Sequence, residues 1–230
     1  MENSSISLFI QNNFTNIFDL NATSTGTMLK NYYPLLAVEL GLSIICSLAL
    51  IVIYIVIDEH RTIPGKNIIS ISCCLIVTYI LLIIDLLLRD SISKAACEVV
   101  GIIVQTTFLA TFFWTNVMSY DIMKTIASVK QEPERTSYWI YSLYAWGMTF
   151  ICVMPTAILD HVQFVPFEYK PHFGMQKCWL SGQVAYLIYF NVPVGITLFS
   201  NCVFFIMTAR TIVKVRNATN ILAANRHKKR

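Results

Sequence analysis

The seven cysteines are the residues of this sequence with the most evident chemistry, because a thiol can form a disulfide, bind a metal or act as a nucleophile. Five of them lie inside long apolar runs, where a cysteine usually serves as a small buried hydrophobic residue. Cys97 and Cys178 instead lie just before the third and the fifth of these runs. If both face an oxidising compartment, no other cysteine there competes for either partner. A disulfide between them is then favoured over two free thiols.

Two acidic residues inside apolar runs are the next candidates. Glu39 lies about one turn into the first run, and Asp85 lies about one turn from the end of the second. An acid in a membrane segment usually faces the interior of a bundle or a water-filled cavity. Either residue could therefore contact a ligand or lock two helices together. The alternative is that each lies near enough to the lipid headgroups to stay solvated.

The sequence contains no recognisable catalytic or cofactor-binding motif. It has no Gly-x-Ser-x-Gly, no His-Glu-x-x-His and no phosphate-cradling loop. The four histidines lie in loops or tails, without the paired spacing of a metal site. We therefore expect no enzyme activity, no metal and no cofactor. The basic residues at 226–230 follow a membrane segment, which favours anionic lipid over nucleic acid as their partner.

The elements that position these residues suit lipid rather than water. Apolar residues make up 56% of the sequence and charged residues only 13%, against about 25% charged residues in ordinary soluble chains. Five apolar runs each approach the roughly 20 residues with which an α-helix crosses the hydrocarbon layer. We predict an all-α integral membrane protein whose bundle occupies residues 34–209. Its five transmembrane helices are expected at about residues 35–57, 68–88, 99–120, 138–159 and 184–209.

The distribution of basic residues predicts how these helices are oriented. If the amino terminus is outside, the segments 58–67, 121–137 and 210–230 face the cytosol, and they contain 12 of the 17 Lys and Arg residues. This excess on one side is the positive-inside bias of membrane proteins. The sequence therefore predicts a multi-pass protein with an extracellular amino terminus and a basic cytosolic tail at 210–230.

The amino-terminal tail, residues 1–33, has the composition of an extracellular segment. Asn3, Asn13 and Asn21 each begin an Asn-x-Ser/Thr sequon for N-glycosylation. The alternative is chance, because Asn, Ser and Thr are abundant in this tail. The tail has no basic region and no cleavage site typical of a signal peptide, so we expect the first helix to export it.

Uncharged polar residues and prolines inside the predicted helices indicate how the bundle is held together. Asn116 and Asn191 are expected to hold helices together by hydrogen bonds, although a role in switching is the alternative. Pro155 and Pro193 each remove a backbone hydrogen bond and should bend their helices. Gly147 is small enough to allow two helices to approach closely.

Four strings of residues, in order and suitably spaced, resemble a known family. These are Arg61–Asn67, Phe112–Asp121, Tyr141–Gly147, and Cys178-Trp179 followed by Tyr189–Gly195. Over about residues 34–215 the chain is similar to the Methuselah-like branch of the secretin-like (family B) G-protein-coupled receptors of insects. The resemblance implies that the five helices correspond to the first five of a seven-helix receptor.

The resemblance also implies roles for individual residues. Cys97 and Cys178 would form the family disulfide, and Trp114 and Asn116 would pack beside Trp146 and Gly147. The bundle core is thus expected to comprise Trp114, Asn116, Trp146, Gly147, Asn191 and Pro193. The cytosolic coupling face would comprise Lys66, Asp121, Lys124, Arg210 and Lys214, although the positive-inside bias alone also explains the basic residues there.

The resemblance favours one function and leaves two alternatives. We expect a plasma-membrane receptor that transmits the signal of an extracellular ligand, a peptide or a small molecule, to a heterotrimeric G protein. Because the family has seven helices, we expect this chain to be truncated after the fifth. A non-signalling form that acts as a decoy or as a dominant-negative partner of a full-length receptor is the alternative. A transporter or channel subunit is less favoured, because the five helices show no internal repeat.

Overall fold

The computed structural model describes residues 34–88, 91–127, 137–162, 164, 166–173 and 178–228. The predicted glycosylation sites Asn3, Asn13 and Asn21 lie outside these residues. The chain divides into two compact units, Met1–Leu42 and Ser43–Arg230, and the boundary falls within the first helix, Pro34–Val56.

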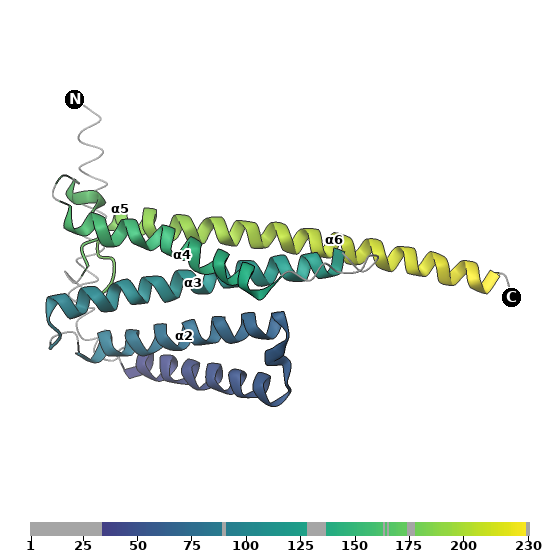
Figure 1. The fold of residues 1–230 in the computed structure, drawn as a ribbon, viewed down its shortest axis with the longest axis horizontal. Coiled ribbons are helices and arrows are strands. Elements are labelled where there is room, and N and C mark those ends of the chain that lie inside the picture. The colour runs from purple at the N-terminus through teal and green to yellow at the C-terminus, as the bar shows by residue number, and fades with distance from the viewer. Residues whose placement is uncertain are drawn as a thin grey trace, which may run out of the picture. The chain divides into compact units, whose positions relative to one another are not determined.

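The described chain is built from helices (Figure 1). The long helices after the first are α2 (Ile63–Leu88), α3 (Lys94–Ala127) and α4 (Tyr138–His161). The short helix α5 (Gln183–Tyr186), the π-helical turn η3 (Leu187–Asn191) and α6 (Val192–Lys228) follow one another without a break. Two 3-10 turns, η1 (Glu59–Arg61) and η2 (Phe167–Tyr169), lie in the connections.

Among the described residues, five helical segments are long and apolar enough to cross a membrane. The prediction of an all-α membrane protein with five transmembrane helices is therefore confirmed. The helix ends differ from the predicted ones: α2 begins at Ile63 rather than 68, α3 extends from Lys94 to Ala127, and α6 continues to Lys228 rather than ending at 209. A hydropathy window locates the apolar part of a helix, whereas the backbone hydrogen bonds continue through polar residues at either end.

α3 is the central helix of the second unit and contacts α2, α4 and α6 (Figure 1). Its side chains Val104, Leu109 and Trp114 are completely buried. The outward side chains of the other helices are apolar, as in Leu143 of α4 and Phe205 of α6, which are 76% and 73% exposed. Such a surface is unfavourable in water and suits hydrocarbon, so the burial pattern agrees with a bundle surrounded by lipid.

Buried hydroxyl groups join α3 to α2. The Thr78 hydroxyl of α2 lies 2.7 Å from the Thr107 hydroxyl of α3, and each also lies within hydrogen-bond distance of a carbonyl of its own helix, so one of the two hydrogens is shared between two acceptors. Both residues are buried, so leaving either hydroxyl without a partner would cost free energy. This pair fixes the position of α2 along α3.

The start of α2 requires a glycine. A Cβ atom added to Gly65 would overlap the carbonyl oxygen of Glu59 in η1, and that oxygen belongs to the backbone and cannot rotate away. The Thr62 hydroxyl accepts a hydrogen bond from the Gly65 N–H at 3.1 Å, which holds the same turn closed. Gly147 differs, because an added Cβ there meets no atom of the described chain within 4 Å.

We predict that Gly65→Ala destabilises the protein whereas Gly147→Ala does not. The overlap in Gly65→Ala must be relieved by a backbone shift, at a cost of about 1–3 kcal/mol. Gly147→Ala should be neutral or should stabilise by up to about 1 kcal/mol, because alanine favours the helix. Thermal unfolding of the purified chain in detergent micelles measures both. Equal losses of stability would contradict the expected difference and would place Gly147 at a close helix contact.

Candidate functional site

One end of the second unit is closed by a disulfide. Cys97 at the start of α3 is bonded to Cys178, which precedes α5, and their Cα atoms are 4.7 Å apart. Both cysteines are buried, at 7% and 1% exposure. The predicted disulfide is confirmed, and it ties the connection between α4 and α5 to α3. We call this the disulfide end of the bundle, and the end near Ile63, Ala127 and Tyr138 the opposite end.

Asp85 of α2 supports the same connection. Its Oδ1 accepts a hydrogen bond from the Cys178 backbone N–H at 3.0 Å. A carboxylate that accepts from a buried N–H forms a strong, charge-assisted hydrogen bond. Asp85 therefore links α2 to the segment that the disulfide holds on α3, which agrees with a lock between elements, one of the roles considered for this residue.

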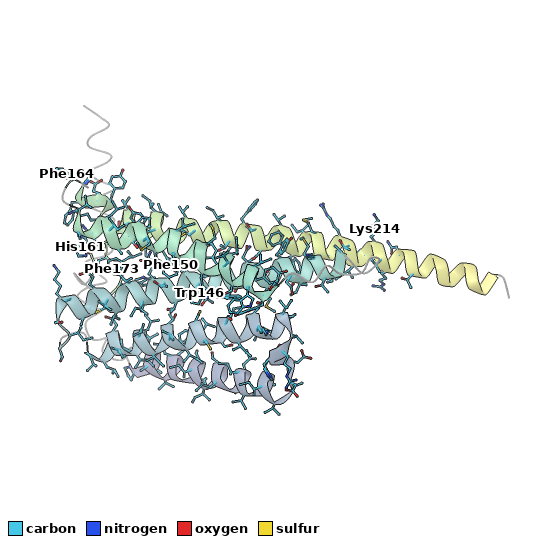
Figure 2. All side chains as sticks on the ribbon, in the orientation of Figure 1. Trp146, Phe150, His161, Phe164, Phe173 and Lys214 are labelled. Carbon is cyan, nitrogen blue, oxygen red and sulfur yellow. A yellow bond between two sulfur atoms is a disulfide. The ribbon has the colours of Figure 1, made fainter. Side chains whose placement is uncertain are left out.

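The connection lies directly against α3 one turn beyond the disulfide. A Cβ added to Gly101 would lie 2.8 Å from the Cys178 carbonyl oxygen and 2.8 Å from Phe173 Cδ1. Phe173 is 2% exposed and lies near the disulfide end of the bundle (Figure 2). Only glycine at 101 leaves room for this approach, because both the backbone and a buried ring occupy the space that a side chain would need.

The end of α4 holds the connection from its other side. The Asp160 Oδ1 atom accepts a hydrogen bond from the His172 N–H at 2.9 Å. His161 Nε2 lies 2.8 Å from Glu98 Oε1 of α3. Contacts to α2, α3 and α4 therefore fix the path of this connection over the helix ends.

Trp179, next to the disulfide, anchors an aromatic cluster. Its ring stacks on Phe108 of α3 with centroids 5.9 Å apart, and meets Tyr186 and Phe190 edge-on at 5.6 and 5.0 Å. Offset and edge-on pairs of this kind are the favoured arrangements of aromatic rings. The cluster joins the connection, α3 and the start of the α5–η3–α6 segment.

The side chains of Asp85, Cys97 and Cys178 offer three potential metal ligands within 4.8 Å of one another. Both sulfur atoms are bonded to each other, however, and a metal requires a free thiolate. The chemistry of this group is therefore that of a structural disulfide beside a carboxylate.

Farther into the bundle, Gln105 of α3 bonds to a carbonyl group four residues before a proline. Its Nε2 donates to the Tyr189 carbonyl oxygen at 3.4 Å, and its side chain is completely buried. In a regular α-helix the Tyr189 carbonyl would pair with the N–H of residue 193, but Pro193 has no N–H. Tyr189 instead lies in the π-helical turn η3, in which a carbonyl pairs with the N–H five residues later. The Gln105 amide adds a hydrogen bond from α3 to this carbonyl.

The other end of the Gln105 amide reaches α4. The Thr156 hydroxyl lies 3.1 Å from Gln105 Oε1 and 2.6 Å from the Val153 carbonyl oxygen, and its single hydrogen serves these two acceptors. Thr156 is completely buried and directly follows Pro155. One amide thus connects α3 with α4, which contains Pro155, and with the α5–η3–α6 segment, which contains Pro193.

A second polar network lies toward the opposite end. Asn116 Nδ2 donates to Asn201 Oδ1 of α6 at 2.9 Å, and Asn116 Oδ1 accepts from the Tyr144 hydroxyl of α4 at 3.0 Å. One turn further, the Tyr141 hydroxyl donates to Asp121 Oδ1 at 2.8 Å. Asn116 is 6% exposed, so this network is a link between α3, α4 and α6 within the bundle.

The residues predicted for the bundle core occupy different environments. Trp114 is completely buried and stacks on Tyr138 with centroids 5.6 Å apart. Trp146, labelled in Figure 2, is half-buried and packs against the core cluster. Gly147 and Pro193 are half-buried, and Asn191 is exposed. The structure brings Trp114 and Asn116 into one core with α4, but it does not bring Asn191 to them.

The residues predicted for the coupling face lie toward the opposite end. Lys66 Nζ lies 5.5 Å from the Tyr138 ring centroid, a distance that suits a cation–π contact. Asp121 and Lys124 are half-buried, whereas Arg210 and Lys214 are exposed on α6. Lys214 is labelled in Figure 2. Of the two predicted intramembrane acids, Asp85 is half-buried beside Cys178, and Glu39 is exposed on the first helix.

The sequence analysis gave no individual role to Gln105, Thr156, Tyr144 or Tyr141, although both tyrosines belong to the string Tyr141–Gly147. Two signals could have identified Gln105. It is the largest polar side chain in an uncharged apolar run, and each proline predicted a carbonyl in need of a donor. The tyrosines gave no signal, because aromatic residues are common in membrane helices.

We predict that Asp85→Ala destabilises the disulfide end by about 1–3 kcal/mol, since it leaves the buried Cys178 N–H without this acceptor. Asp85→Asn should reduce the stability less, because its amide oxygen can still accept the hydrogen bond. Thermal unfolding and labelling of the reduced cysteines by a membrane-impermeant maleimide measure the effect. If Asp85→Asn reduced the stability as much as Asp85→Ala, the negative charge rather than the hydrogen bond would be the important feature.

We predict that Gln105→Leu destabilises the bundle by about 0.6–2 kcal/mol, the usual range for a hydrogen bond between membrane helices. The loss should be smaller in a Pro193→Ala background, because residue 193 then has an N–H to pair with the Tyr189 carbonyl. A double-mutant cycle by reversible unfolding measures this coupling. Thr115→Val is the control, since among the described residues the Thr115 hydroxyl bonds only to the Thr111 carbonyl of its own helix. Strictly additive effects would contradict the link between Gln105 and the proline.

Comparison with known proteins identifies the family of this chain. The model of the seven-transmembrane receptors of the secretin family matches residues 29–230. The chain is 26% identical over 193 residues to the G-protein coupled receptor Mth of Drosophila melanogaster, covering 81% of this chain and 37% of that receptor. It is 29% identical over 180 residues to the G-protein coupled receptor Mth2 of Drosophila yakuba, covering 76% of this chain and 34% of that receptor.

These matches confirm the resemblance to the Methuselah-like receptors. The chain spans about a third of the length of these relatives. The matched family consists of receptors rather than enzymes. Because one family model covers all five membrane helices, the chain belongs to the secretin family of seven-transmembrane receptors.

Proposed function

We propose that this chain forms the first five membrane helices of a Methuselah-like receptor that passes an extracellular signal to a heterotrimeric G protein. The observation that carries this proposal is the family match over residues 29–230. The similar proteins Mth and Mth2 are named G-protein coupled receptors. The match also favours a receptor over a transporter or channel subunit.

The disulfide end is the proposed ligand side. A disulfide forms and persists in an oxidising compartment, so the position of Cys97–Cys178 supports an extracellular disulfide end. This orientation puts the amino terminus outside and the basic segment 210–230, which includes the end of α6, in the cytosol, as the basic residues also indicate. A peptide or small molecule would meet the connection that Asp85 and Gly101 hold against the helices.

The opposite end is the proposed coupling side. The Asp121–Tyr141 hydrogen bond and the Lys66–Tyr138 contact fix polar groups at the ends of α2, α3 and α4. Arg210 and Lys214 on α6 add exposed positive charge that can contact lipid headgroups or a G protein. These residues give a G protein a polar surface at the level of the membrane boundary.

Expression of the protein that the natural transcript encodes tests the signalling proposal. We expect it at the plasma membrane, and we expect dissociation of at least one G-protein type above the level of mock-transfected cells. Normal surface expression without a response from any G-protein type would contradict the proposal. Co-expression with a seven-helix relative would then test the decoy alternative, which requires a lower surface level of that relative.

We predict that treatment of the expressed chain with peptide N-glycosidase F increases its electrophoretic mobility. Replacing Asn3, Asn13 and Asn21 together by Gln should abolish this shift, because the proposed orientation exposes these sequons to the glycosylation machinery. Asn217→Gln is the matched control: Asn217 also begins a sequon but lies on the proposed cytosolic side. A shift that depends on Asn217 would reverse the proposed orientation.

A further inference from the structure

A cavity of about 340 Å³ lies between α3, α4 and α6, toward the opposite end of the bundle. Its α3 wall is formed by Asn116, Val117 and Tyr120, and its α4 wall by Tyr141, Tyr144 and Ile140. All of these residues belong to helical segments long and apolar enough to cross a membrane. Cavities of about 300–1,000 Å³ are the usual size for binding small molecules.

Aromatic rings hold the walls of this cavity in place. The Tyr120 ring meets Tyr141 edge-on with centroids 6.5 Å apart, and it meets Phe204 of α6, which also lines the cavity, at 5.7 Å. The Tyr141 hydroxyl is fixed by Asp121, and the Tyr144 hydroxyl by Asn116. The cavity thus has mostly apolar walls, and their rings and hydroxyl groups are held in place by contacts within the protein.

Two polar groups at the cavity have unused hydrogen-bonding capacity. The Tyr120 hydroxyl has no hydrogen-bond partner among the described residues, and its side chain is partly exposed. The amide of Asn116, which is 94% buried, uses one N–H for Asn201, so its second N–H has no partner in the described chain. A ligand with one hydroxyl group could satisfy Tyr120, Asn116 or both.

The lining residues do not favour an anionic headgroup as the occupant. None of the described residues that line the cavity is charged. The aromatic and aliphatic walls instead favour a neutral, mostly apolar molecule. Such a molecule reaches a cavity between membrane helices through the bilayer.

We propose that this cavity binds a sterol of the surrounding membrane. A sterol is a rigid and apolar ring system with a single hydroxyl, which matches the aromatic, mostly apolar lining and the few unused polar groups. Its hydroxyl stays near the headgroups while its rings extend toward the bilayer centre. Tyr120 lies one turn before Lys124, close to the polar end of α3, whereas Asn116 and Tyr144 lie one turn deeper.

The sequence of α3 independently agrees with a sterol. Val117, Tyr120 and Lys124 match a short pattern proposed for sterol contact, an aliphatic residue followed by tyrosine and then a basic residue. The pattern is common by chance, so the cavity is the principal evidence. Here two of its three residues line the same cavity. The proposal depends on the membrane helices of the family and not on the proposed signalling.

Photolabelling of the purified full chain tests the proposal. The chain is reconstituted in phosphatidylcholine vesicles with a trace of a photoreactive, diazirine-bearing cholesterol analogue, and labelled peptides are identified by mass spectrometry. We expect the label on the peptides that contain Val117–Tyr120 and Ile140–Tyr144. Excess cholesterol should remove it, and epicholesterol, whose hydroxyl points to the other ring face, should compete about tenfold less well.

Matched variants distinguish this cavity from general contact with lipid. Ile140→Trp fills the cavity from its exposed rim and should lower the labelling about tenfold, since it removes the space for the rings. Leu143→Trp is the control, because Leu143 is 76% exposed on the same helix and does not line the cavity. Tyr120→Phe keeps the ring contacts and should raise the cholesterol concentration needed for competition about tenfold.

Three results would overturn the proposal. The label could be spread evenly over the lipid-facing peptides of all helices, or Ile140→Trp and Leu143→Trp could label alike. A photoreactive phosphatidylcholine could also label the same two peptides as strongly as the sterol analogue, which would make the cavity an acyl-chain groove. An intact Cys97–Cys178 disulfide in non-reduced peptide maps verifies that each variant is folded.

Discussion

Hydrocarbon offers no hydrogen-bond partner to a backbone N–H or C=O, so every backbone polar group of this bundle inside the membrane must be paired within the protein. Most polar side chains of α3 are paired as well, although the buried Trp114 Nε1 has no partner among the described residues. The hydroxyls of Thr106, Thr111, Thr115 and Ser119 each donate to the carbonyl one turn earlier in the same helix. Bonded in this way, they can lie in lipid without a neighbour. Asn116 and Gln105 offer more hydrogen-bonding groups than one helix can satisfy, so they bond to α4 and to the α5–η3–α6 segment.

At the disulfide end, a covalent bond and a carboxylate hold the structure together instead. The connection before α5 is held by the Cys97–Cys178 bond, by Asp85 on the Cys178 N–H, and by the close approach at Gly101. A carboxylate near the end of a membrane span costs less free energy than one at the bilayer centre. The disulfide end is therefore fixed by a covalent bond, whereas the interior of the bundle is fixed by hydrogen bonds between neutral side chains.

The sequence was sufficient to predict what depends on composition along the chain. The five apolar runs identified the helices, and Cys97 and Cys178 were the two cysteines outside those runs. The ends of α2 and α6 could not be predicted, because helical hydrogen bonding continues past the last apolar residue. The hydrogen-bond partners of the polar residues could not be predicted from the sequence either. Asp85 bonds to a backbone N–H 93 positions later, and Gln105 to a carbonyl 84 positions later, so neither partner has a recognisable residue type.

The π-helical turn η3 explains how α3 can bond to the α5–η3–α6 segment at two levels. Gln105 and Asn116 are eleven residues apart on α3, and an α-helix returns to the same face after eleven residues to within about 20°. Their partners, Tyr189 and Asn201, are twelve residues apart, which in a regular helix would turn Asn201 away by about 120°. A π-turn accommodates one extra residue, and η3 includes Tyr189. The turn thereby restores the register between the two helices. Pro193 makes this geometry favourable, because it lacks the N–H that a regular helix would have offered to Tyr189.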